Sequence, residues 1–195
     1  MSDQIPEAIR RQFADFQAFR RALTQESDRG CALFAAAFLD TALEQLVRAS
    51  LLQSKKVDED LLEGTAPLAT FSARIKLSYY LGLISAECRA ELDTIRKIRN
   101  DFAHDASLIS FDTQSIADRC LNLGYSYHDS DHRPRGHFTA STSRLLALIQ
   151  RLTAAAKPPT VRSDDRPTAE EKAANRKGIS AMIEQLLPLK NSEKL

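Results

Sequence analysis

Three residues within one short segment have side chains that could act together on RNA, and they are Arg99, Asn100 and His104. A histidine can move a proton at a ribose 2′-hydroxyl or at the leaving oxygen. The planar fork of an arginine can stabilise the charge that develops on the phosphorus centre. Asn100 would orient either group, while Arg96 and Lys97 would hold phosphate. This set raises the hypothesis of a metal-independent endoribonuclease.

The same segment reads as the end of a helix over residues 85–104, capped by Ser85. At 100° per residue, one face is apolar and carries Leu92, Ile95, Ile98 and Phe102. Residues 96, 100 and 104 are spaced four apart, so they form a ridge beside that face. Residue 99 lies on the adjacent ridge with a small alanine at 103, which leaves room for a ligand or another helix.

A purely structural explanation of this segment stays open. Arg99 could pair with a carboxylate of a neighbouring helix, for example Asp40 or Glu44, and His104 could bond the last carbonyls of its own helix. In the same way, Arg74 could face a phosphate, but we favour an ion pair between Arg74 and an acidic group, with Ile75 in the core.

The rest of the chain predicts an all-α protein, a single bundle of about five to six helices. Residues 54–66 form a connector with one short turn at 58–63, and residues 124–136 form a loop. We expect Asp28, Pro67, Gly82 and Asp112 to mark helix ends. Besides 85–104, the periodicity predicts helices over residues 5–23, 28–53, 68–81, 112–123, 138–156 and 169–187.

These patterns divide the chain into three parts: a bundle domain over 1–156, a linker over 157–168 and a C-terminal amphipathic helix and tail over 169–195. The linker begins with two prolines and is charged, which breaks the preceding helix. The terminal helix could dock on the bundle, on a dimer mate or on another protein, or be a frayed end.

Composition restricts the function further. The chain has 27 basic and 26 acidic side chains, a formal net charge of +1, which is weaker than in dedicated duplex-DNA binders. Cys31, Cys88 and Cys120 are widely spaced and odd in number, as in proteins of a reducing compartment. The longest apolar run, residues 31–39, is too short to cross a bilayer, and no signal pattern opens the chain. We therefore expect a cytoplasmic protein with no membrane contact.

A metal site is not predicted. His128, His132 and His137 lie in one polar loop with Asp129 and Asp131, but the neighbouring proline and glycine oppose the helical spacing that metal-binding histidines need. We expect no metal and no cofactor.

Arg99, Asn100 and His104 also resemble the Arg-polar-xxx-His motif of HEPN domains. Those domains are helical bundles that often dimerise and include ribonuclease toxins and defence proteins. The resemblance implies a catalytic role for the three residues, with two copies meeting at a dimer interface. It implies an antitoxin as a protein partner.

A longer part of the chain, roughly residues 30–150, is similar to the mannitol-repressor family of bacterial regulators. The matching stretches are 37–44 (AFLDTALE), 64–68 (GTAPL), 71–77 (FSARIKL), 80–84 (YLGLI), 95–104 (IRKIRNDFAH) and 134–138 (PRGHF). This resemblance implies a cytoplasmic helical regulator without a helix-turn-helix. Sequence-specific DNA binding is accordingly not expected.

The two resemblances agree on a helical bundle and differ on function. Our leading interpretation is a regulatory protein that acts through protein or RNA contacts, and the alternative is the ribonuclease, a toxin or phage-defence effector. Whether the chain is an enzyme stays open between them. We expect a homodimer with the 85–104 helix near its interface.

Overall fold

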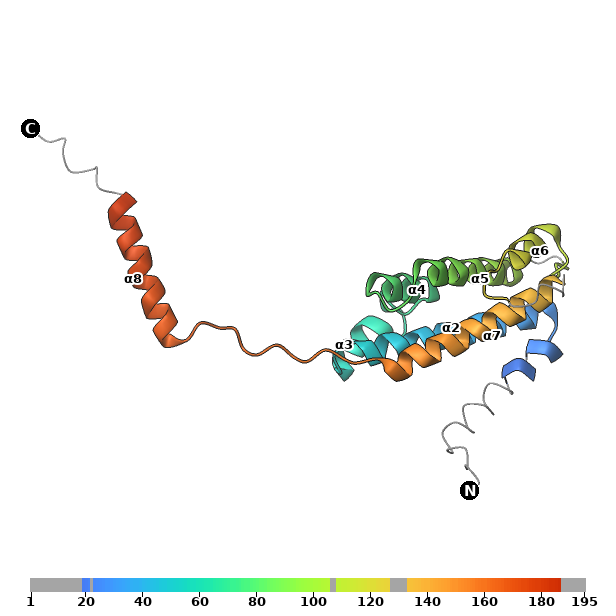
Figure 1. Cartoon of the computed structure of the whole chain (residues 1–195), viewed down its shortest axis with the longest axis horizontal. Coiled ribbons are helices and arrows are strands. Elements are labelled where there is room, and N and C mark those ends of the chain that lie inside the picture. The colour runs from blue at the N-terminus through green and yellow to red at the C-terminus, as the bar shows by residue number, and fades with distance from the viewer. Residues whose placement is uncertain (1–18, 22, 106–107, 127–132, 187–195) are drawn as a thin grey trace, which may run out of the picture. The chain divides into compact units, whose positions relative to one another are not determined.

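The computed structural model describes residues 19–21, 23–105, 108–126 and 133–186, and within these ranges all regular structure is helical. The chain divides into two compact units, Met1–Pro159 and Thr160–Leu195. The predicted all-α class is confirmed, and the first unit is the helical bundle (Figure 1).

The bundle is organised around one long helix, α2. Its largest interface is with α7, and α4 and α5 pack on it from another side (Figure 1). Helix α6 packs mainly on α7. The bundle helices are α2 (Asp28–Ser50), α3 (Lys55–Leu62), α4 (Phe71–Tyr80), α5 (Ala86–His104), α6 (Gln114–Leu121) and α7 (Pro134–Ala155).

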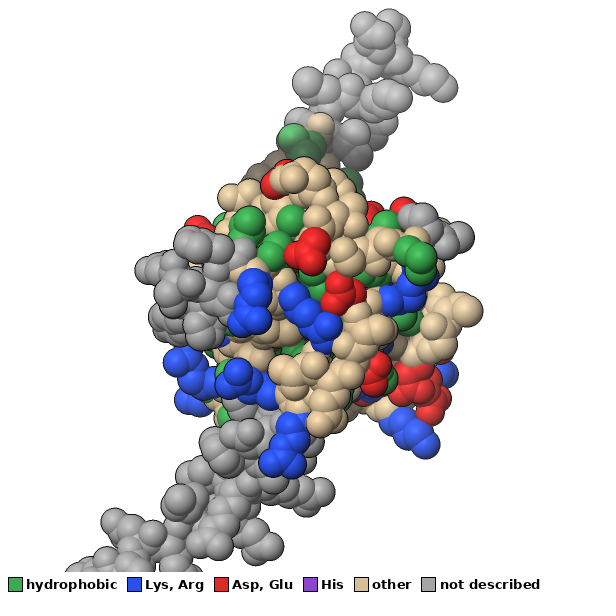
Figure 2. Space-filling view, turned by 90° about the vertical axis from the view of Figure 1, so that its right-hand side faces the viewer, with side chains coloured by type: hydrophobic (Ala, Val, Ile, Leu, Met, Phe, Trp, Pro, Cys, Tyr) green, Lys and Arg blue, Asp and Glu red, His purple; other side chains and the backbone are tan. Residues whose placement is uncertain are grey.

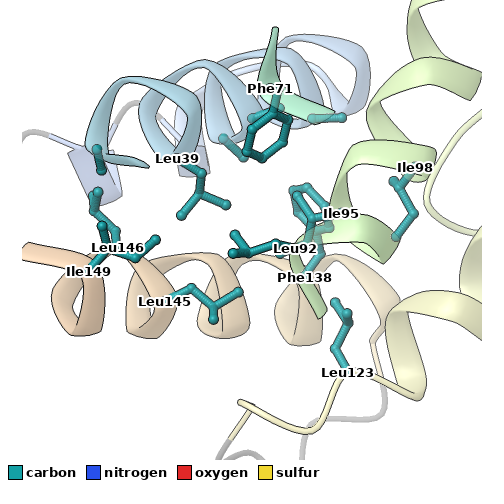
Figure 3. Close-up of a cluster of buried hydrophobic side chains, with 14 of the residues drawn as sticks. Leu39, Phe71, Leu92, Ile95, Ile98, Leu123, Phe138, Leu145, Leu146 and Ile149 are labelled. Atoms are coloured by element: carbon teal, nitrogen blue, oxygen red, sulfur yellow. The ribbon is translucent and has the colours of Figure 1, made fainter. Parts of the chain in front are cut away.

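The inner face of α2 explains its central position. Four small residues of its first half, Cys31, Ala32, Ala35 and Ala36, are buried and let neighbouring helices approach closely. Larger side chains follow on the same face and join one hydrophobic core with α4, α5 and α7 (Figure 3). By length and composition α2 could cross a membrane, but half of the apolar stretch is buried within the protein. Burial in the bundle accounts for its apolar character.

The start of α2 differs from the prediction by one residue. Ser27, not Asp28, is the N-cap, because its hydroxyl accepts a hydrogen bond from the Gly30 N–H at 3.1 Å. Asp28 instead joins distant parts of the chain. Its carboxylate accepts from the Phe111 N–H at 2.9 Å and from the Arg135 guanidinium at 2.8 Å.

Helix α4 is shorter than predicted. It begins at Phe71 behind the N-cap Thr70, so Pro67 is not its first residue but lies in the preceding turn. Its predicted end is confirmed, because Gly82 follows with φ at +70°, a conformation that glycine adopts without strain. The prediction for α5 is also confirmed, since the Ser85 hydroxyl accepts from the Cys88 N–H at 3.2 Å.

Helix α7 begins four residues earlier than the predicted Phe138. Pro134 takes the first turn, where its missing N–H is not needed, so residues 134–136 are helical and not loop. Arg135 anchors this turn by donating to the carbonyls of Leu23 and Glu26 at 2.9 and 2.5 Å.

The boundaries of α3, α6 and the first predicted helix compare with the prediction as follows. The short turn expected at 58–63 is part of the helix α3, and the N-cap of α6 is Thr113, one residue after the predicted Asp112. Of the helix predicted over 5–23, residues 1–18 and 22 lie outside the described residues, and 19–21 and 23–25 are helical.

In the part of the second unit that the structure describes, residues 160–186, there is one helix, α8 (Ala169–Leu186), at the predicted position. Thr168 and Glu171 form a reciprocal cap in which each side chain accepts from the backbone N–H of the other, at 3.2 and 2.7 Å. All side chains of α8 are exposed, including Ile179, Met182 and Leu186.

The three cysteines are free and buried, and they carry a pH prediction. Burial raises the pKa of the Cys31 and Cys88 thiols to about 11 and that of Cys120 to about 12. The unfolded chain loses these protons near the ordinary pKa of 9.0, before the folded chain does. We therefore expect the free energy of unfolding to fall as pH rises from about 9 to 11.

Two measurements check this prediction. Iodoacetamide at pH 8 should modify Cys31 and Cys88 of the folded protein roughly 100-fold more slowly than in the urea-unfolded chain, as a shift of two pKa units implies. Cys120→Ala should flatten the loss of stability above pH 9 in urea titrations. Rapid labelling of the native protein would contradict the buried position of the thiols.

Candidate functional site

Helix α5 has the faces that the sequence predicts. Leu92, Ile95, Ile98 and Phe102 are fully buried and hold the helix against the core. That packing fixes the rotation of α5, so the polar ridge of Asn100 and His104 lies at the surface. The sequence is therefore sufficient to place the candidate residues on the outside of a rigid helix.

Asn100 and His104 share a pocket between the end of α5 and the start of α6. The pocket has a volume of about 590 Å³ and is open to solvent. Asp101 and Asp105 line it from α5 and its C-cap, and Thr113, Ser115, Ile109 and Ile116 line it from the following segment.

Arg99 does not line this pocket. It is half-buried on the neighbouring ridge of α5. Within the described part of the chain, neither Arg99, Asn100 nor His104 has a side-chain hydrogen bond or ion pair. The structure thus brings two of the three predicted residues together and leaves all three available to an outside partner.

The structural alternatives for these residues are wrong. The carboxylates of Asp40 and Glu44 are bound by Arg74, at 2.7 and 2.6 Å, and not by Arg99. The carbonyl of Asp101 accepts from the Asp105 N–H at 3.0 Å, and among the described residues no hydrogen bond joins the His104 side chain to the last carbonyls of its helix.

Arg96 and Lys97, the predicted phosphate-binding pair, also differ from each other in their surroundings. Arg96 donates to Asp93 at 3.2 Å within α5 and is half-buried, whereas Lys97 is exposed. An arginine that is already paired with a carboxylate attracts a phosphate less strongly than a free one.

The electrostatics of the pocket oppose an anion. Its charged lining consists of two carboxylates and one histidine. Asp101 is paired with Arg119, and the backbone carbonyl of Asp105 accepts from Arg29 at 2.8 Å. Asp101 and Arg119 therefore offset each other, and no lysine or arginine of the described chain lines the pocket to hold an RNA phosphate.

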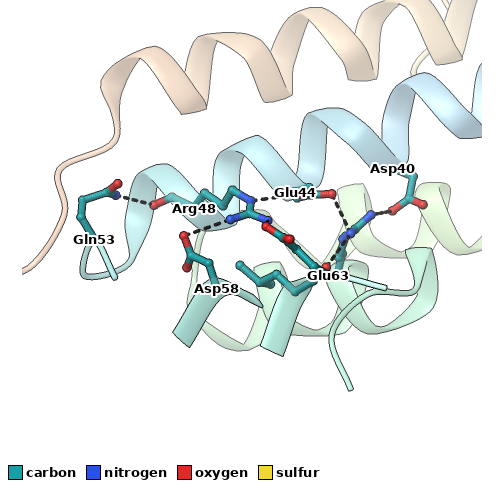
Figure 4. Close-up of polar contacts among 8 residues, drawn as sticks. Asp40, Glu44, Arg48, Gln53, Asp58 and Glu63 are labelled. Atoms are coloured by element: carbon teal, nitrogen blue, oxygen red, sulfur yellow. Dashed lines mark hydrogen bonds and ion pairs between the residues drawn. The ribbon is translucent and has the colours of Figure 1, made fainter. Parts of the chain in front are cut away.

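A polar network stiffens the opposite end of the bundle (Figure 4). The buried Arg74 binds Asp40, Glu44 and the Leu62 carbonyl, the last at 3.2 Å. Arg48 continues the network and binds Glu44 at 2.9 Å. It also binds Asp58 and Glu63, at 2.9 and 3.1 Å. The prediction that Arg74 pairs with an acidic group and that Ile75 lies in the core is confirmed.

The α6 end of the bundle carries a second polar pocket that the sequence did not indicate. Basic side chains gather there beside acidic ones (Figure 2). The pocket has a volume of about 480 Å³ and is lined by Arg20, Arg133, Arg135, Asp28 and Asp112, among others. Only the fold reveals it, because its residues come from segments more than 100 positions apart.

Two further cavities, which the sequence also did not indicate, adjoin each other at α3 and α4. One, of about 290 Å³, includes Leu52, Val57 and Leu61, and the other, of about 510 Å³, includes Tyr79 and Tyr80. Leu68 lines both. A sequence signal that could have pointed to the second cavity is the adjacent pair Tyr79 and Tyr80.

Of the five residues considered for a metal, His128, Asp129, Asp131 and His132 lie outside the described residues. His137 lies in α7, where its Nδ1 is buried and has no hydrogen-bond partner. The described residues contain no group of three or more potential metal ligands.

Comparisons with known proteins agree with the geometry. A family model described as mannitol repressor matches residues 21–164. Among solved structures, a chain of the X-ray structure of the MtlR-HPr complex from Escherichia coli is similar. It has 22% sequence identity and a TM-score of 0.59, and the match covers 70% of this chain and 98% of that one. No curated protein matches the sequence.

Proposed function

The chain belongs to the mannitol repressor family, and from this premise we propose that it is a regulatory protein that acts by binding another protein. The family match carries the proposal, since it spans the whole described bundle. The similar solved structure is that of a complex of MtlR with HPr, which makes HPr the first partner to test.

The distribution of charge supports protein contacts over DNA binding. The net charge is only +1, and many bundle arginines are neutralised inside the molecule. Each of the following has a carboxylate partner: Arg48, Arg74, Arg96, Arg119 and Arg135. With a net charge of only +1, the chain has no strong basic excess to displace counterions from a DNA backbone, which is the main source of affinity for DNA.

We propose a cytoplasmic location on related grounds. The three cysteines are buried as free thiols, which persist in a reducing compartment. Fractionation of cells that produce a tagged chain tests this, and recovery in the membrane fraction would contradict it.

We expect purified HPr from the same organism to bind the full chain with a micromolar dissociation constant, typical of transient regulatory contacts. Isothermal titration calorimetry gives the constant and the stoichiometry. A random duplex DNA of equal concentration, titrated at 150 mM salt as a control, should give no comparable signal. Absence of any HPr binding, together with tight sequence-specific binding of DNA, would overturn the proposal.

The second candidate is a metal-independent endoribonuclease. One observation favours it: Asn100 and His104 share an open pocket, and neither they nor Arg99 has a partner among the described residues. In this candidate His104 transfers the proton, Asn100 orients it, Arg99 stabilises the charge, and Arg96 and Lys97 hold phosphate. Two copies would have to meet, because Arg99 does not line the pocket of its own chain.

Because no lysine or arginine of the described chain lines the pocket, we expect no RNA cleavage by wild-type protein in EDTA. Sedimentation velocity on the same sample shows whether the predicted homodimer is present. Cleavage that survives EDTA, and falls by roughly 10²–10⁴-fold in both Arg99→Ala and His104→Ala, would establish the ribonuclease instead. Lys177→Ala, on the separate helix α8, is the control variant.

A further inference from the structure

Two cavities at the α3 and α4 end of the bundle share Leu68, and together they form a surface that we call the apolar groove. Its walls expose large apolar side chains. Tyr80 is 88% exposed and Val57 is 49% exposed. A connected apolar surface of this kind marks an interaction site more often than a free surface.

The groove is preformed. The Leu68 N–H donates to the Leu61 carbonyl at 2.9 Å and fixes the connection between α3 and α4. The Arg89 guanidinium lies 4.6 Å from the centre of the Tyr79 ring, which holds that ring in place. The network of Arg48 and Arg74 supports the same elements from behind. A ligand therefore meets a surface with little ordering cost.

The charges beside the groove are all of one sign at its tyrosine end. Lys76 and Arg89 are the charged residues that line this cavity. In the described part of the chain, neither has a carboxylate partner, in contrast to Arg48 and Arg74. In the leucine cavity the charged residue is Asp58, and Arg48 neutralises it. An occupant with carboxylates near Lys76 and Arg89 would complete both ion pairs.

We propose that this groove docks an acidic segment of the protein partner, with leucine or phenylalanine side chains entering the two cavities and carboxylates meeting Lys76 and Arg89. The inference rests on the proposed function, because it names the surface through which the regulator holds its partner. The two cavities in series fit an extended or helical segment. The apolar lining suits aliphatic and aromatic side chains better than a nucleic acid.

The test is selection of peptides from a phage-displayed library of random sequences of about 12 residues on the immobilised full chain. We expect the enriched peptides to be net acidic and to contain leucine or phenylalanine. A fluorescein-labelled copy of the most enriched peptide is then titrated against wild type and variants by anisotropy. Lys76→Glu should weaken binding about tenfold or more, and Tyr80→Ala about fivefold or more.

Two matched controls keep the result specific. Lys177→Glu makes the same charge change on α8, and Leu33→Ala removes an exposed apolar side chain from α2. Both should bind as wild type does. Lys76 and Tyr80 are exposed, so their variants should unfold at the wild-type temperature.

Several outcomes would overturn the inference: no enrichment, enrichment of basic peptides, or binding unaffected by Lys76→Glu. Self-association lost in Tyr80→Ala would assign the groove to a second copy, and binding of oligouridine lost in Tyr80→Ala would assign it to RNA.

Titration with HPr distinguishes the groove proposal from the proposal that HPr is the partner. HPr binding that is unchanged in both variants contradicts the groove alone, whereas peptide binding without HPr binding contradicts HPr as the partner.

Discussion

Replacing Arg74 with methionine is expected to lower the free energy of unfolding by about 3–5 kcal/mol, because it leaves Asp40 without its cation and Glu44 with Arg48 alone. Arg74 is only 7% exposed and binds Asp40 and Glu44 at 2.7 and 2.6 Å. It also donates to the Leu62 carbonyl at 3.2 Å. The substitution therefore disconnects α4 from both α2 and α3. Urea unfolding followed by circular dichroism measures the loss.

The comparison variant is Lys55→Met, which breaks the exposed pair with Glu59 at 3.8 Å. That change should leave stability unaltered within error. Adding Asp40→Asn to Arg74→Met should recover part of the loss, since it removes the unpaired carboxylate. If Arg74→Met costs less than about 1 kcal/mol, the network is not essential to the fold.

Phe138→Ala is expected to lower the free energy of unfolding by about 3–5 kcal/mol, because it leaves a cavity in the core. The Phe138 side chain is fully buried, and its ring centre lies 4.9 Å from that of Phe111. Phe111 lies in turn 5.0 Å from Phe102. The three rings join α7, the segment before α6, and α5. Thermal and urea unfolding measure the effect.

Two further variants test whether the loss of stability comes from the lost side-chain volume and from the burial of that side chain. Phe138→Leu retains most of the side-chain volume and should cost about 1 kcal/mol. Phe34→Ala removes the same atoms from a side chain that is 45% exposed, and its cost should be much smaller. Equal losses for Phe34→Ala and Phe138→Ala would contradict the described core.

Local patterns were enough to predict the helices, because each depends on residues that are close in sequence. The buried positions of Leu92, Ile95 and Phe102 follow from helical spacing, and the end of α4 follows from Gly82. Two of the errors occur where two good capping residues are adjacent, as with Ser27 and Asp28. The role of Asp28 depends on Phe111 and Arg135, which no local pattern relates to it.

The candidate site was predicted less completely for the same reason. Spacing on one helix placed Asn100 and His104 on a common ridge, and they do share a pocket. It could not show that Asp101 and Asp105 line the pocket or that Arg99 lies outside it. Asp40 pairs with Arg74 through a tertiary contact between two residues 34 positions apart, which spacing along one helix cannot predict. The apolar groove escaped prediction because residues far apart in the sequence, from Leu51 to Pro159, build it.

The pairing of α2 with α7 has a consequence for how the chain folds during its synthesis. Helix α2 ends at Ser50 and α7 begins at Pro134, so the ribosome adds roughly 80 residues between the two. At a synthesis rate of about 5–20 residues per second, roughly 4–16 seconds pass between the synthesis of α2 and that of α7, its largest packing partner. During that interval the leucines of α2 can bind other exposed chains. We infer that the nascent bundle depends on chaperones more than its small size would suggest.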